Sequence, residues 1–108
     1  MDYFLKATSL TQILEESRVQ PVIIFKFSSK CGSSTRLFKI LEKKISEKIL
    51  FAPVYKIIVQ KQPVLSTKIA EWFNTKHESP QIFILNKGKV TYTAHHNNIN
   101  IKNFIFIQ

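Results

Sequence analysis

A run of consecutive apolar residues constrains the fold of this chain more than any other feature. Val22, Ile23, Ile24 and Phe25 follow one another within residues 21–27, and all four side chains are β-branched or aromatic. A strand with one wet face would alternate apolar and polar residues, whereas a continuous apolar run predicts a strand buried on both faces. Such a strand needs a layer of helices on each side of its sheet. The run therefore predicts a three-layer α/β fold.

The segments around this strand alternate between helical and strand patterns. The expected helices span residues 9–18, 33–48 and 63–74, and the expected strands span residues 21–27, 51–59, 81–85 and 90–94. Ser9 and Gln12 form a capping box at the first helix, and Trp72 and Phe73 are expected in the core. A hairpin turn over 86–89, with Gly88 suited to positive φ, joins the last two strands.

The order of these segments predicts the sheet. Helices connect the first three strands and a tight turn connects the last two, so we expect an α/β sandwich with a four-stranded mixed sheet and helices on both faces. Residues 97–108 fit both a strand and a helix. We expect a helix there, because the order of layers requires one. We expect a single domain over residues 1–108.

The composition excludes several classes of function. The chain has 108 residues, a hydrophobic fraction of 44% and a formal net charge of +9. Its lysines, Lys26 among them, are spread along the chain and mostly fall on expected solvent faces, so we expect no nucleic-acid partner. No apolar run could span a membrane and the N-terminus lacks a long apolar signal core, so we expect a cytoplasmic protein. The basic surface would attract an acidic small thiol or acidic proteins.

The single cysteine, Cys31, marks the candidate active site. One cysteine excludes an intramolecular disulfide and a zinc site built from several thiolates. Cys31 follows the polar turn 28–30 and directly precedes an expected helix. Unpaired N–H groups and the helix dipole favour an anion there, and Lys30 adds positive charge, so the nucleophilic thiolate is favoured. The alternative is a buried, unreactive cysteine.

Three segments of the sequence are distinctive: Lys26-Phe-Ser-Ser-Lys-Cys31-Gly-Ser-Ser34, the strand and helix around 55–60 and 65–70, and Lys76-His-Glu-Ser-Pro-Gln81 with the following turn. Together they resemble the monothiol bacilliredoxin family of the bacillithiol system, within the thioredoxin-like superfamily. The resemblance covers nearly the whole chain, and the His-Glu-Ser-Pro-Gln segment is its most specific part. Gly32 and Ser33 depart from the family, which usually has proline and then a bulkier apolar residue at these positions.

The resemblance implies a thioredoxin-like three-layer sandwich and a monothiol thiol–disulfide oxidoreductase. Cys31 would be the catalytic nucleophile, and Lys30, Gly32, Ser33 and Ser34 would support its thiolate. Ser34 stands where dithiol enzymes keep a resolving cysteine, so a mixed disulfide on Cys31 would need a second thiol molecule for its release. Ser34 would either donate a hydrogen bond to the thiolate or only cap the first helical turn.

The resemblance also implies a substrate site at Ser79, Pro80 and His77. The Ser79–Pro80 bond is expected to be cis and to face Cys31, with the Ser79 backbone available to a bound thiol or peptide. No cofactor is expected. The co-substrate would be bacillithiol, with glutathione or coenzyme A as alternatives, and the partners would be bacillithiolated proteins. We expect a monomer.

Other assignments remain open from the sequence. Cys-Gly-Ser-Ser at 31–34 is also similar to the Cys-Gly-Phe-Ser of monothiol glutaredoxins, which carry iron–sulfur clusters, although their Gly-Gly pair is missing after the last strands. A catalytically idle scaffold is a further alternative. A metal site at His77, His95 and His96 is not expected, because only one cysteine and no spaced set of carboxylates accompany them. A Cys–His nucleophile pair is the stronger rival.

Overall fold

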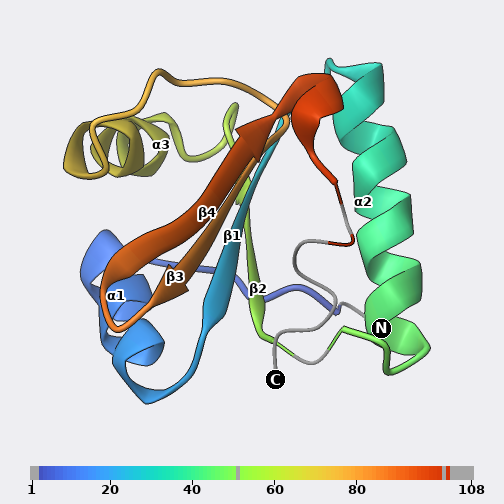
Figure 1. Ribbon diagram of the computed structural model, residues 1–108. Coiled ribbons are helices and arrows are strands. Elements are labelled where there is room, and N and C mark those ends of the chain that lie inside the picture. The colour runs from blue at the N-terminus through green and yellow to red at the C-terminus, as the bar shows by residue number, and fades with distance from the viewer. Residues whose placement is uncertain (1–2, 51, 101, 103–108) are drawn as a thin grey trace.

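The computed structural model describes residues 3–50, 52–100 and 102, and its elements follow the expected order (Figure 1). They are α1 (Leu10–Val19), β1 (Val22–Phe27), α2 (Gly32–Ser46), β2 (Val54–Ile58), α3 (Pro63–Trp72), β3 (Gln81–Asn86), β4 (Lys89–His95) and the short 3-10 helix η1 (His96–Asn98). The helix expected over 97–108 does not form at the start of that range, because the 3-10 helix η1 ends at Asn98 and residues 99–100 are not helical. Most of the expected range lies outside the described residues.

The four strands form one mixed sheet in the order β2-β1-β3-β4. Strand β1 runs parallel to β2 and antiparallel to β3, and β3 pairs with β4 as a hairpin. Figure 1 shows α2 on one face of the sheet and α1 and α3 on the other. The predicted thioredoxin-like sandwich, with helices on both faces, is confirmed.

The apolar run in β1 supplies side chains to both faces. Ile23 and Phe25 pack against α2 residues such as Leu41, while Val22 and Ile24 pack under α1 and α3. All four β1 residues are fully buried. Because each such side chain contributes about 1.5–3 kcal/mol on burial, this strand anchors the two helical layers.

The predicted local signals are present with small changes. The Ser9 hydroxyl accepts a hydrogen bond from the Gln12 N–H, as a capping box requires, but the Gln12 side chain accepts from the Thr8 N–H instead of the Ser9 N–H. In the β3–β4 turn, Lys87 and Gly88 both have positive φ, at 53° and 78°. Two such residues match a type I′ hairpin turn.

Two expectations about burial were wrong. Trp72 is 64% exposed, because the apolar stripe of α3 ends on Phe73, which packs against Phe83 with ring centroids 5.5 Å apart. Trp72 instead lines an open groove between α1 and α3. Lys26, which was expected with the solvent-facing lysines, is fully buried, because it lies in the central strand β1 on the face that α3 covers.

Candidate functional site

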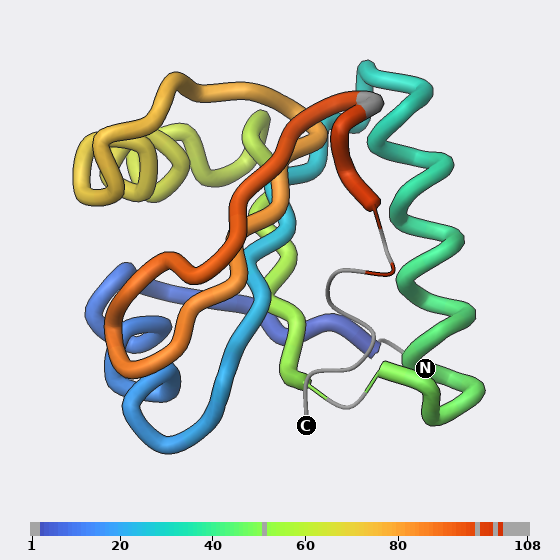
Figure 2. The backbone as a smooth tube through the Cα atoms, viewed as in Figure 1, coloured from blue at the N-terminus to red at the C-terminus, as the bar shows by residue number. Residues whose placement is uncertain are grey.

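Cys31 lies where three distant parts of the chain meet. Figure 2 shows the turn after β1, the loop before β3 and the turn after β4 converging at one end of the sheet. Cys31 is half-buried and is the N-cap residue of α2. Its N–H donates to the Ser28 carbonyl at 3.2 Å, and its carbonyl accepts from the Thr35 N–H at 3.2 Å. These two bonds hold the backbone from which the Cys31 side chain projects.

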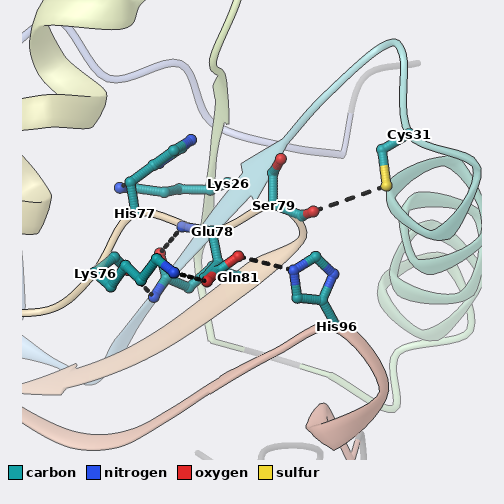
Figure 3. Close-up of polar contacts among 8 residues, drawn as sticks. All are labelled: Lys26, Cys31, Lys76, His77, Glu78, Ser79, Gln81 and His96. Carbon is teal, nitrogen blue, oxygen red and sulfur yellow. Dashed lines mark hydrogen bonds and ion pairs between the residues drawn. The ribbon is translucent and has the colours of Figure 1, made fainter.

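The Cys31 sulfur faces the loop before β3. As a thiol it donates to the carbonyl oxygen of Ser79 over 3.7 Å (Figure 3), and the Ser79–Pro80 bond is cis, as predicted. As a thiolate it can accept from the N–H and hydroxyl groups of Ser33 and Ser34 in the first turn of α2. The Ser34 N–H is the largest influence, and these donors together lower the pKa of the Cys31 thiol despite its partial burial.

Ser34 lies in the first turn of α2 and is fully buried. Its hydroxyl oxygen accepts a hydrogen bond from the Ser28 N–H at 3.2 Å. That bond uses the oxygen as an acceptor and leaves the O–H free to donate to the Cys31 sulfur. The hydrogen bond to the thiolate predicted for Ser34 is therefore compatible with its position, whereas no side chain caps the start of α2, so the alternative capping role is not seen. The residue links the turn after β1 to the nucleophile.

Gln60 is a site residue that the sequence did not reveal. Its side-chain amide donates to the Ser28 hydroxyl at 2.6 Å and accepts from the Ser29 N–H at 3.2 Å. Gln60 follows β2, whose carboxyl end lies beside that of β1, with Phe27 opposite Ile58. The parallel pairing of β1 and β2 could have indicated the role of Gln60, because polar residues that follow neighbouring parallel strands meet at one edge of the sheet.

The other wall of the site is a loop held by its own side chains. The buried Gln81 amide donates to the Lys76 carbonyl at 3.2 Å and accepts from the Glu78 N–H at 3.3 Å. The Pro80 carbonyl accepts from the His96 N–H at 3.0 Å, and the His96 ring lies 2.9 Å from the Glu78 carboxylate. The hydrogen bond from His96 lowers the pKa of the Glu78 carboxyl. This network fixes the loop opposite Cys31, and Figure 3 shows its contacts among Lys76, Glu78, Gln81 and His96.

His77 points away from the sulfur. Its Nδ1 lies 3.3 Å from the Lys26 Nζ and 3.3 Å from the Ser66 hydroxyl, and Figure 3 shows it beside Lys26 on the far side of Ser79 from Cys31. Within the described part of the chain, no histidine ring bonds to the sulfur, so the Cys–His pair is not formed there. A role for His77 in substrate binding stays a prediction.

Lys26 is a buried cation with neutral partners. Its Nζ donates to the Ser66 carbonyl at 2.9 Å and lies 5.9 Å from the centre of the Phe83 ring. Burial lowers the pKa of Lys26 to about 8. Burial of the ring, followed by the nearby Lys26 charge, also lowers the pKa of His77. Among the described residues, no carboxylate lies within 4 Å of Lys26.

The remaining predicted site residues surround the sulfur without changing this geometry. Lys30 is exposed, and its N–H donates to the Ser28 hydroxyl at 3.3 Å. Gly32 is the first residue of α2, with open space where a Cβ atom would stand. Pro80 is buried beside Ser79. The support that Lys30 and Gly32 give to the thiolate stays a prediction.

The part of the chain that the structure describes has neither a metal-binding cluster nor a membrane-spanning helix. No group of three or more His, Cys, Asp or Glu side chains is arranged to hold a metal ion, and no helix is long and apolar enough to cross a membrane. A cavity of about 700 Å³ lies between α1 and α3 and includes Trp72 in its wall. Cys31 is not among the described residues that line this cavity.

Several solved structures share this fold. One, described as a proposed oxidoreductase with a thioredoxin fold, is 30% identical, with a TM-score of 0.79 over 93% of this chain and 88% of that one. Reduced thioredoxin pre-protein from Schistosoma mansoni is 21% identical (TM-score 0.60, 83% and 79% covered), and a variant thioredoxin from Halobacterium salinarum is 17% identical (TM-score 0.68, 88% and 79% covered). The fold and the N-cap cysteine thus define a thioredoxin-type redox protein.

The comparison with protein families is more specific. The family described as monothiol bacilliredoxin BrxC matches residues 4–104. The chain belongs to this monothiol bacilliredoxin family. Together with the oxidoreductase neighbours, this membership gives the chain a role in thiol redox chemistry.

Proposed function

We propose that this protein reduces mixed disulfides between proteins and bacillithiol, acting in the cytoplasm as a monomer without a cofactor. The observation that carries the proposal is the position of Cys31, with thiolate donors on one side and the Ser79 carbonyl 3.7 Å away on the other. A thiolate held in this way is a nucleophile open to an extended disulfide. The family supports bacillithiol as the small thiol.

The reaction has two exchanges that conserve electrons. The Cys31 thiolate attacks the bacillithiol sulfur of the mixed disulfide, a new disulfide forms on Cys31, and the substrate protein leaves as a thiolate that takes up a proton. A second bacillithiol thiolate then attacks this adduct, which releases oxidised bacillithiol and restores Cys31. Ser34 cannot form a disulfide, so the second thiol must come from solution. We propose that the Ser79 backbone and Pro80 support the incoming disulfide.

The direct test is the mass of the protein after incubation with oxidised bacillithiol. We expect one bacillithiol adduct on the wild type and none on Cys31→Ala, and the adduct should disappear when free bacillithiol is added. A matched control is Ser46→Ala on the exposed end of α2, which should form the adduct at the wild-type rate. Absence of the adduct, together with a brown colour after anaerobic cluster reconstitution, would overturn the proposal in favour of an iron–sulfur carrier.

A further inference from the structure

A small cavity adjoins Cys31 on the α2 side of the site. Its volume is about 260 Å³, and among the described residues its walls are Ser33, Arg36, Leu37, Ile40, Pro80, His96 and Ile99. One of these residues bonds to the sulfur, and another is the chain neighbour of a residue that does. Ser33 is one of the thiolate donors, and Pro80 follows Ser79, which accepts from the thiol. The cavity therefore begins where a group bonded to the Cys31 sulfur would extend.

Arg36 gives this cavity a positive charge. It lies five residues after Cys31 on the same helix, about 7 Å further along the helix axis at the usual rise per residue. Among the described residues, no carboxylate lies within 4 Å of its guanidinium. The nearby acid, Glu78, is already engaged at 2.9 Å by His96 and at 3.8 Å by Lys76. Arg36 is thus the charged group in this wall that is open to an anion.

The rest of the wall limits what the anion can be. Leu37, Ile40 and Ile99 make one side of the cavity apolar, and the volume suits a fragment of a small molecule instead of a folded segment. A guanidinium binds a carboxylate through two parallel hydrogen bonds, and this geometry also fixes the orientation of the ligand. The chemistry of the wall therefore matches a compact carbon body that ends in a carboxylate.

We propose that this cavity binds the carboxylate-bearing part of a low-molecular-weight thiol while the sulfur of that thiol is joined to Cys31, with Arg36 as its charge partner. The inference rests on the proposed function and adds a determinant of which thiol is accepted. Arg36 makes and breaks no bond in the exchange. It makes the enzyme select the small-thiol half of a mixed disulfide, which also ensures that Cys31 attacks the bacillithiol sulfur and releases the protein as a thiol.

The test compares one carrier peptide joined in turn to three thiols. Bacillithiol and glutathione both carry carboxylates, whereas 2-mercaptoethanol is neutral. The measured quantity is the second-order rate constant for adduct formation on Cys31 in a single turnover, followed by mass. The variants are Arg36→Gln, Arg36→Lys and, as a matched control, Arg18→Gln, which changes the exposed arginine in the last turn of α1.

We expect the wild type to react at least about tenfold faster with the carboxylate-bearing disulfides than with the neutral one, as a charge-assisted pair would give. Arg36→Gln should lose about tenfold on the anionic substrates and less than twofold on the neutral one. Arg36→Lys should recover part of the loss, and Arg18→Gln should match the wild type. The ratio between bacillithiol and glutathione then shows which carboxylate arrangement the cavity prefers.

Other outcomes overturn the inference in distinguishable ways. Equal losses on the anionic and neutral substrates would mean that Arg36 only supports the fold of α2. Unchanged rates in Arg36→Gln, or a wild type without preference, would remove Arg36 as a determinant while the exchange itself still stood. If no thiol forms an adduct on Cys31, the proposed function fails and this inference fails with it.

Discussion

Lys26 and Cys31 are five residues apart and lie on opposite sides of the same strand end. The pKa of each is lowered, but for opposite reasons. Hydrogen-bond donors lower the pKa of the Cys31 thiol, which favours its charged form. Burial among neutral groups lowers the pKa of Lys26 to about 8, which disfavours its charged form. The α2 side of the sheet therefore stabilises the Cys31 thiolate, whereas on the α3 side the charged form of Lys26 is destabilised by burial.

This difference separates function from stability. Cys31 is half-buried and its interactions lie within a helix start and one loop, so changes there should alter reactivity first. Lys26 links β1 to the Ser66 carbonyl of α3 and to His77 of the loop, so changes there should alter the folded state first. If the two sides are as independent as their contacts, a substitution on one side should leave the property of the other unchanged.

The largest expected effect is a pH dependence of stability that belongs to Lys26. Between its folded pKa of about 8 and its ordinary value of 10.5, the unfolded chain binds more protons than the folded one. Stability contributed by this group therefore rises with pH across that window. The wild type should gain about 2–3 kcal/mol between pH 7 and pH 10 relative to Lys26→Met, since one pKa unit is worth 1.36 kcal/mol.

Urea denaturation followed by circular dichroism measures the free energy of unfolding of both proteins at each pH. The wild type and Lys26→Met have all other titrating groups in common, so the contributions of those groups cancel in the difference. Lys39→Met on the outer face of α2 is the matched control, and its stability should run parallel to that of the wild type. If Lys26→Met and the wild type also run parallel, the lysine does not carry a buried charge and the contrast between the two sides is lost.

The second effect concerns the thiolate. Alkylation of Cys31 by iodoacetamide across pH should give a midpoint below the ordinary value of about 8.5, because Ser33 and Ser34 donate to the thiolate. Ser34→Ala should raise this midpoint by up to about one unit, since the hydroxyl is lost but the stronger backbone N–H remains. Ser46→Ala should leave it unchanged.

Alkylation of Cys31 in Lys26→Met tests whether the buried lysine influences the thiol. Lys26 is not among the groups that shift the thiol pKa, so the midpoint should move by less than about half a unit. A rise of a full unit in Lys26→Met would show that the buried cation acts on the sulfur through the sheet. The two sides would then form one site.

Local signals in the sequence predicted the reactive side better than the structural side. Each of these signals depends on only a few neighbouring residues: the apolar run of β1, the helical spacing of α2 and the lone cysteine between them. The structure has the strand and the helix where they were expected, with the cysteine between them. The burial of Lys26 and the position of Gln60 depend on which strands and helices become neighbours. Periodicity along one segment does not contain that information, so both residues were missed.

Trp72 illustrates the same limit within one helix. Helical spacing places Trp72 and Phe73 near the same stripe, and only the contact of Phe73 with Phe83 decides which of them is covered. The cis bond before Pro80 was predicted from the family resemblance, not from spacing, and the structure confirms it. Its partner network through Gln81 and His96 became visible only with the loop in place.

The smallest expected effect tests the first turn of α2, where the chain departs from its family. Cys31 has φ of −113° and ψ of 118°, a conformation that the residue before a proline readily adopts. Gly32 is the first helical residue, and open space surrounds the place where a Cβ atom would stand. Gly32→Pro should therefore raise the free energy of unfolding by about 0.4–1 kcal/mol, because proline restricts the unfolded chain.

The same substitution should leave the thiolate almost unchanged. The N–H that proline removes belongs to position 32, whereas the donors that lower the thiol pKa belong to Ser33 and Ser34. Gly32→Ala serves as the matched control, because alanine also adds a Cβ atom in open space but keeps the backbone N–H. If Gly32→Pro instead raises the alkylation midpoint by about a unit, the first turn must move to accommodate the ring, and the flexibility of glycine there would itself be part of how this thiolate is held.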